Sequence, residues 1–185
     1  MTKAGAFLAR WRVRLGYPLA LLVLWFARPT LRSIWLAIPV GILGLLVRAL
    51  AAGHLHKQEV LTVTGPYACT RNPLYFGSAI LTLATAIATR SWISAAILCG
   101  YFALFYAVVM QREEEELRQL HGPAFEEYVK SVPLFFPRLT PAKMSPESQG
   151  SFSFEQYKKN HEFQAAIGFV LLLAALFGIW WLRGH

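Results

Sequence analysis

The sequence predicts an all-α protein, an integral membrane helical bundle with about five transmembrane helices. Hydrophobic residues fill 56% of the 185 positions and charged residues only 15%, a balance too apolar for a soluble domain of this size. The apolar residues also gather in separate blocks, and a helix needs roughly 20 of them to cross the hydrocarbon core of a bilayer. We therefore expect one integral membrane domain over residues 1–185.

The apolar blocks follow one another as successive membrane crossings. The first, residues 15–27, is short, but Arg14 and Arg28 can extend it by reaching toward the two interfaces. This block resembles a signal peptide in its basic flank but lacks a cleavage site of small residues, which favours a retained anchor. The stretch 138–160 begins rich in Pro and Ser and is expected to be a linker before the C-terminal helix. The four longer blocks are 33–53, 73–89, 91–111 and 163–182.

The charge pattern predicts an orientation. Lys and Arg number 18 against 10 acidic residues, a net charge of +8 that would attract nucleic acid or anionic lipid. No basic stripe with interleaved aromatic residues is present, so membrane lipids are expected as partners and nucleic acid is not. With a cytoplasmic N-terminus, fourteen of the 18 basic residues lie inside, as the positive-inside rule requires. Two polar segments, 53–72 and 112–161, then face the cytoplasm, and we expect a bacterial inner membrane.

A short amphipathic helix is predicted within the second polar segment. Pro123 suits a first helical position, and Phe125, Tyr128 and Val129 would then share one face. Glu126, Glu127 and Lys130 would point away. Such a helix is expected along the membrane surface.

Familiar catalytic and metal motifs are absent from the sequence. It contains no GxGxxG, Walker loop, HExxH or GxSxG, so nucleotide-dependent oxidoreductases, ATPases, zincins and serine hydrolases have no motif here. Cys69 and Cys99 lack the spacing of a zinc site or a disulfide framework, and no metal is expected. The search for a site therefore narrows to the two polar segments.

The first polar cluster runs from Gly65 to Gly77, from a turn into the start of an apolar block. Asn72 suits the N-cap and Pro73 the first position of the helix. Arg71, next to backbone amides at the positive end of the helix dipole, would suit a carboxylate or phosphate. An alternative interpretation is equally open: Gly65 and Pro66 only make the turn, Asn72 only caps the helix, and Arg71 pairs with lipid headgroups.

The second cluster is a run of four glutamates directly after an apolar block, and two interpretations are open. A run of glutamates is usually a solvated face, which remains the expectation for Glu115 and Glu116. Four acids fit poorly at a helix C-terminus, however, because the dipole disfavours negative charge there. Either the helix continues past the bilayer, or a cationic group compensates Glu113 and Glu114.

Together, the two clusters resemble a known family, the membrane-embedded methyltransferases of the isoprenylcysteine carboxyl methyltransferase and phospholipid methyltransferase superfamily. The family is marked by a Gly-Pro-Tyr turn, an Arg-His-Pro-x-Tyr helix start and a later Glu-Glu pair. The resemblance covers residues 48–137, the expected catalytic region. The matching residues are Gly65-Pro66-Tyr67, Arg71-Asn72-Pro73-Leu74-Tyr75 and Glu113-Glu114, followed by Leu117, Gly122, Tyr128, Val132-Pro133 and Pro137.

The resemblance implies a helical membrane enzyme that uses S-adenosylmethionine without a Rossmann domain. It implies that Tyr67, Arg71, Tyr75 and the Glu113–Glu114 pair surround the cofactor. The chemistry agrees, because Arg71 suits the carboxylate of S-adenosylmethionine and a glutamate suits its ammonium group.

Two positions depart from the family pattern and limit how far the roles of the family's residues can be assigned to this chain. Asn72 replaces the usual histidine; it can still contact the cofactor, but it cannot titrate near neutral pH. Val109 replaces an arginine found in many relatives, which removes a clamp for a substrate carboxylate. His54, with His56 and Lys57, is a candidate replacement, although exposed loop residues are the commoner explanation.

The expected function is therefore S-adenosylmethionine-dependent methyl transfer to a lipophilic acceptor, either a prenylcysteine-like carboxylate or a lipid amine. No catalytic acid or base is assigned, because the protein mainly has to supply proximity and exclude water. Two alternatives stay open, a noncatalytic transporter of small molecules or lipids, and a structural membrane anchor.

Overall fold

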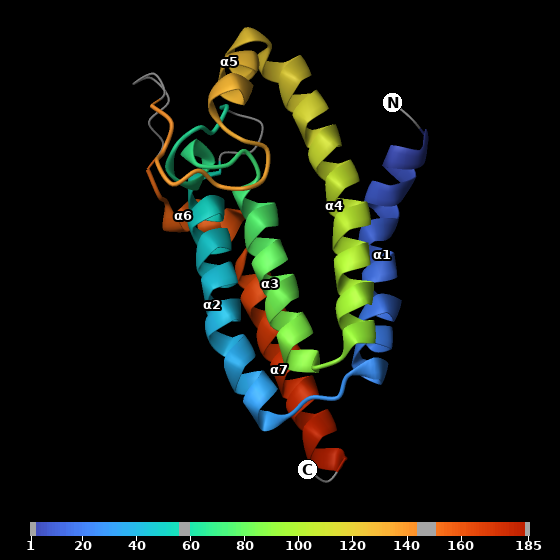
Figure 1. The fold of residues 1–185 in the computed structure, drawn as a ribbon. Helices are drawn as coiled ribbons and strands as arrows, with labels where there is room; N and C mark the ends of the chain where they lie inside the picture. The colour runs from blue at the N-terminus through green and yellow to red at the C-terminus, as the bar shows by residue number, and fades with distance from the viewer. Residues whose placement is uncertain (1–2, 56–59, 144–150, 184–185) are drawn as a thin grey trace. The chain divides into compact units, whose positions relative to one another are not determined.

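The computed structural model describes residues 3–55, 60–143 and 151–183, and the described chain is helical throughout, without a strand (Figure 1). Four helices exceed 18 residues, and shorter elements join them. The elements are α1 (Lys3–Phe26), α2 (Leu31–His54), the 3₁₀ helix η1 (Gly65–Ala68), α3 (Pro73–Thr89), α4 (Trp92–His121), α5 (Pro123–Ser131), α6 (Phe154–Lys159) and α7 (Phe163–Leu182). This confirms the predicted all-α class.

Three of the described helices are long and apolar enough to cross a membrane, namely α2, α4 and α7. The apolar part of α1, Leu15–Phe26, and the 17-residue helix α3 are shorter. Large apolar side chains such as Trp25, Trp35 and Trp92 are exposed, which suits contact with lipid. The helices therefore agree with a membrane bundle, and two of the five predicted spans fall below full spanning length.

The chain divides into two compact units, each built from several chain segments. The first comprises 1–42, 79–112 and 167–185. Its core is made of small and aliphatic residues, which let helices approach closely. Two side-chain hydroxyls satisfy backbone carbonyls of neighbouring helices: Ser33 Oγ donates to Ala88 O at 3.0 Å, and Ser94 Oγ donates to Val23 O at 2.9 Å. The core residues are Ala27, Ile34, Ala37, Ala88 and Leu176.

The second unit comprises 43–78 and 113–166 and contains both polar clusters. Its core joins Val63 to one face of α5, where Phe125 and Tyr128 are buried and Val129 packs beside them. Glu126, Glu127 and Lys130 are exposed on the opposite face. The predicted amphipathic helix is therefore confirmed.

The glutamate run lies inside a helix, because α4 continues to His121. Its last turn carries Arg118 and His121, which suit the negative end of the helix dipole. Of the two explanations for the glutamates, the longer helix is thus correct, and the site described below shows that a cation is present as well.

The stretch 138–160, expected to be a linker, contains the short helix α6 in its second half. Residues 144–150 of this stretch lie outside the described residues. Ser153 caps α6, its Oγ accepting from Gln156 N at 3.4 Å, and Ser153 N donates to Gly53 O at 2.9 Å. Asn160 Nδ2 donates to the carbonyls of Ala52 and Leu55, at the C-terminal end of α2. These contacts dock the segment on α2 (Figure 1); composition alone could not reveal them.

Two glycines of the second compact unit have a positive φ, a backbone conformation that favours glycine over residues with a Cβ. Gly65 has φ +58°, and a Cβ there would lie 2.6 Å from His54 Nε2. Gly122 has φ +48° with no atom within 4 Å of its would-be Cβ. Gly122→Ala should therefore lower the free energy of unfolding by about 1 to 2 kcal/mol through backbone strain alone. Gly65→Ala should cost more, because the His54 ring must also move; unfolding in detergent measures both.

A double variant separates the two causes. In a His54→Ala background, the Gly65→Ala substitution should cost no more than Gly122→Ala, since the obstructing ring is gone. If Gly65→Ala costs the same with and without the His54 ring, the close contact between the two residues does not exist.

Candidate functional site

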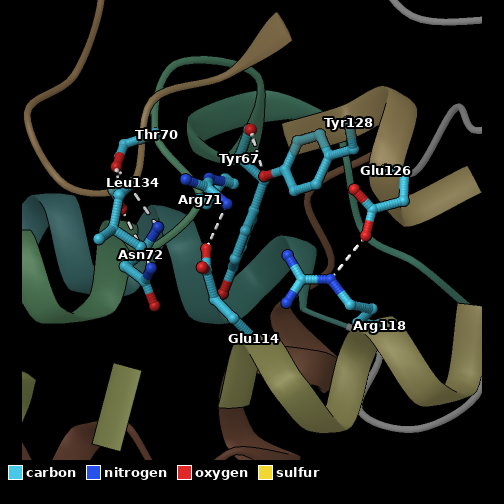
Figure 2. Close-up of polar contacts among 9 residues, drawn as sticks. All are labelled: Tyr67, Thr70, Arg71, Asn72, Glu114, Arg118, Glu126, Tyr128 and Leu134. Carbon is cyan, nitrogen blue, oxygen red and sulfur yellow. Dashed lines mark hydrogen bonds and ion pairs between the residues drawn. The ribbon is translucent and has the colours of Figure 1, made fainter. Parts of the chain in front are cut away.

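The Gly-Pro-Tyr motif forms the 3₁₀ helix η1 and buries Tyr67. Pro66 occupies an early helical position, where its missing N–H costs nothing. Tyr128 of α5 donates its hydroxyl to Tyr67 O at 2.7 Å (Figure 2). The His54 ring lies against Gly65 at the start of the turn, and His54 Nδ1 is 2.8 Å from Leu50 O. The turn is therefore fixed by contacts with both α2 and α5.

The start of α3 is held against residues 133–135. Arg71 N donates to Pro133 O at 3.0 Å, and Thr70 Oγ1 donates to Phe135 O at 2.9 Å. Asn72 precedes the helix as predicted, and its carbonyl accepts from Phe76 N. Its side-chain Nδ2, however, donates to Leu134 O at 3.0 Å (Figure 2). The side-chain amide of Asn72 thus ties α3 to the loop after α5.

Arg71 and Glu114 form an ion pair that joins the two polar clusters (Figure 2). Their side chains are only 12% and 19% exposed, so both charges are largely removed from water. Arg71 Nη1 and Glu114 Oε1 pair with each other, whereas Arg71 Nε is buried and makes no hydrogen bond to the described residues. Buried polar groups are nearly always hydrogen-bonded, so this pair retains unused capacity for a polar ligand.

Tyr75 and Glu113 make a second contact between α3 and α4. The Tyr75 hydroxyl donates to Glu113 Oε1 at 2.5 Å. Glu113 and Glu114 are consecutive in α4, and both reach residues at the start of α3. Glu115 and Glu116 are exposed, as expected for a solvated face.

Tyr67 and Tyr128 are both kept neutral by their surroundings. Burial raises the pKa of Tyr67 far above its ordinary value, and the neighbouring Tyr128 and Glu113 add to the effect. Burial also raises the pKa of Tyr128, against an opposing contribution from the Arg71 charge. Both hydroxyls therefore stay protonated and uncharged near neutral pH, and that of Tyr128 is a hydrogen-bond donor.

Arg48 and Glu162 form a largely buried ion pair that the sequence pattern did not predict. Arg48 Nη2 donates to Glu162 Oε2 at 3.1 Å while Nε pairs with Oε1. Arg48 Nη1 also donates to Ser78 Oγ and to Leu74 O, both in α3. The available signal was Arg48 itself, the one charge inside a long apolar block, because an arginine at such a position almost always has a polar partner.

All seven predicted cofactor residues, Tyr67, Arg71, Asn72, Tyr75, Glu113, Glu114 and His54, belong to the second compact unit. Direct side-chain contacts link Arg71 to Glu114 and Tyr75 to Glu113. The His54 ring lies against the turn at Gly65. His56 and Lys57, named with His54 as a possible clamp, lie outside the described residues.

The arrangement defines a helical membrane protein with a charged site at the junction of α3 and α4. The family model described as phospholipid methyltransferase matches residues 11–124, and the chain belongs to that family. This confirms the resemblance to the isoprenylcysteine and phospholipid methyltransferase superfamily, and it indicates a membrane methyltransferase.

Two curated bacterial proteins are similar to the chain. The nickel-cobalt-cadmium resistance protein NccN of Alcaligenes xylosoxydans xylosoxydans is 34% identical over 116 residues, 63% of this chain and 54% of that protein. The cobalt-zinc-cadmium resistance protein CzcN of Cupriavidus metallidurans is 33% identical over 139 residues, 70% of this chain and 63% of that protein. The chain thus spans less than two thirds of either relative. No solved structure matches it.

The names of these relatives refer to metal resistance, which makes the arrangement of possible metal ligands in this chain relevant. Over residues 3–55, 60–143 and 151–183, no group of three or more His, Cys, Asp or Glu side chains is arranged to hold a metal ion.

The buried tyrosines give the protein a predictable sensitivity to alkaline pH. The ordinary pKa of 10.0 applies in the unfolded chain, whereas the folded value for Tyr128 is higher. Above pH 10 the unfolded state therefore binds fewer protons, and stability falls by up to about 1.4 kcal/mol per pH unit for each such group. We expect Tyr128→Phe to reduce this slope, measured by unfolding in detergent between pH 8 and 11.

Equal slopes for wild type and Tyr128→Phe would show that Tyr128 is not buried as a neutral group.

Proposed function

We propose that the protein transfers a methyl group from S-adenosylmethionine to a lipophilic acceptor. The observation that supports this is the Arg71–Glu114 ion pair, a largely buried cation and anion, in which Arg71 Nε is buried without a hydrogen bond to the described residues. An amino-acid headgroup carries the complementary charges, a carboxylate and an ammonium group.

The residues fit this headgroup by charge and by hydrogen-bonding capacity. Arg71 would bind the carboxylate, because a guanidinium forms strong charge-assisted bonds to carboxylate oxygens. Glu114, with Glu113 next to it, would accept the ammonium group. Tyr75 is already bonded to Glu113 and would fix the orientation of that carboxylate. S-adenosylmethionine itself would supply the methyl group, activated by its sulfonium.

Binding would exchange one set of ion pairs for another. Before binding, Arg71 and Glu114 neutralise each other, which avoids the cost of two unpaired buried charges. A zwitterion would let each residue take a new partner at little net electrostatic cost. A ligand with only one of the two charges would leave either Arg71 or Glu114 unpaired, so the site would favour a complete amino-acid headgroup.

The proposed acceptor is lipophilic because the apolar helices α2, α4 and α7 have the length to lie in a bilayer. A prenylcysteine-like carboxylate and a lipid amine both remain candidates. Val109, in place of the arginine of many relatives, favours an acceptor that needs no second carboxylate clamp. We also propose a bacterial inner membrane, with the site on the cytoplasmic side where the cofactor is made.

Cofactor binding is the decisive test of this function. Purified protein in detergent or lipid should bind S-adenosylmethionine or S-adenosylhomocysteine at a defined stoichiometry, measured by calorimetry. Arg71→Ala and Glu114→Gln should each weaken binding roughly ten- to a hundredfold, since each removes a bond to a charged group worth about 1.5 to 3 kcal/mol. Tyr75→Phe should have a smaller effect, because Glu113 keeps its charge.

Two control variants distinguish the site from other charged positions. Glu116→Gln removes an exposed charge from the same helix, and Glu126→Gln breaks the surface pair with Arg118, whose side chains are 49% and 48% exposed. Both should bind the cofactor like wild type. A folded wild-type protein that binds neither compound would leave the transporter or the structural anchor as the better explanation.

Methyl transfer itself is then tested with labelled S-adenosylmethionine and a lipid extract. Label should appear in an organic-soluble product, and Arg71→Ala should form much less of it at the same cofactor concentration. Transfer only to water-soluble compounds would contradict the lipophilic acceptor.

The orientation can be tested by single cysteines in a variant without Cys69 and Cys99. Val60→Cys in the first polar segment and Lys158→Cys in the second should both react with an impermeant reagent from the cytoplasmic side of membrane vesicles. Arg90→Cys should react from the other side. Labelling of Val60→Cys and Lys158→Cys from opposite sides would rule out the proposed orientation.

A further inference from the structure

The guanidinium of Arg48 connects three chain segments within the second compact unit. It pairs with both carboxylate oxygens of Glu162, with Nη2 at 3.1 Å from Oε2, and Nη1 donates to Ser78 Oγ and to Leu74 O at 3.3 Å. Only a planar guanidinium can serve a carboxylate and a second helix at once in this way. Arg48 therefore links α2, the first turns of α3 and the residue before α7.

This connection is buried and closely packed. Glu162 is 8% exposed and Ser78 is also buried. A Cβ on Gly77 would lie 2.5 Å from Arg48 Cγ and 2.9 Å from Gly44 O, so α2 and α3 are in near backbone contact at this point. The first turns of α3 therefore cannot shift unless the Arg48 side chain shifts too.

The same turns of α3 carry the proposed cofactor residues. Leu74, whose carbonyl accepts from Arg48, is followed directly by Tyr75, and Arg71 lies just before the helix. Tyr75 and Arg71 meet Glu113 and Glu114 of α4. An error in the position of α3 would thus be transmitted to both contacts.

Glu162 is delivered to Arg48 by a segment that the family model does not include. The matched residues end at 124, whereas Glu162 follows α6. Asn160 anchors this segment to the end of α2 through the carbonyls of Ala52 and Leu55.

We infer that Glu162 is a positioning residue which, through Arg48, fixes the first turns of α3 and with them Arg71 and Tyr75. The inference rests on the proposed function, because it concerns the residues proposed to bind the methyl donor. Glu162 acts through the guanidinium that it orients.

The test compares Glu162→Gln with Glu155→Gln, which removes an exposed glutamate from the same segment. The readout is the dissociation constant for S-adenosylhomocysteine, measured by calorimetry on folded full-length protein. Glu162→Gln should weaken binding by roughly tenfold or more, because small misplacements of binding groups are costly. Glu155→Gln should bind like wild type. Wild-type affinity in folded Glu162→Gln overturns the inference.

A charge swap separates positioning from simple stabilisation. Arg48→Glu combined with Glu162→Arg keeps an ion pair between the two positions but removes the donors to Ser78 and Leu74. If the pair only stabilises the protein, the swapped variant should regain both the wild-type melting temperature and the wild-type affinity for S-adenosylhomocysteine. If Arg48 positions α3, the melting temperature should recover more than the affinity. Full recovery of the affinity counts against the inference.

Hydrogen exchange keeps the inference testable if the proposed function is wrong. Should the wild type bind no S-adenosylhomocysteine, the function fails, but the amides of residues 76–80 still report on α3. Their exchange should be faster in Glu162→Gln than in wild type or Glu155→Gln, with α5 unchanged. Unchanged exchange at 76–80 would overturn the inference independently of the cofactor.

Discussion

The second compact unit depends on pairing charges that are largely hidden from water. Arg71 and Glu114 come from segments more than forty residues apart, yet neither could be buried without the other. The pair therefore requires the start of α3 and the extension of α4 to meet. The remaining polar contacts of the unit can be understood as holding these two elements in that arrangement.

The loops of this unit are ordered by backbone hydrogen bonding as much as by apolar packing. Thr70, Arg71 and Asn72 all donate to carbonyls of residues 133–135, and Tyr128 donates to the carbonyl of Tyr67. A short motif thus has two tasks, since its side chains and amides bind the loop after α5 while Arg71 remains directed toward α4. In this chain the Arg-x-Pro-x-Tyr motif both holds the start of α3 against the loop after α5 and supplies candidate binding residues.

The family match concerns the type of protein, whereas the names of the relatives concern a cellular role of those relatives. The family match, over residues 11–124, covers most of α1, all of α2, α3 and α4, and both polar clusters, and it indicates a membrane methyltransferase. The relatives NccN and CzcN are named for metal resistance, and the chain spans only part of each.

The sequence by itself determined the helical class, the apolar blocks, the amphipathic face of α5 and the residues of the two polar clusters, because these follow from local periodicity and composition. Only the tertiary structure decided which side chains pair with one another. Sequence spacing could not show that Glu114, rather than Glu113, pairs with Arg71, or that the amide of Asn72 turns to Leu134. Nor could it reveal the pair between Arg48 and Glu162, since contacts across 114 positions depend on how the helices pack and leave no local pattern.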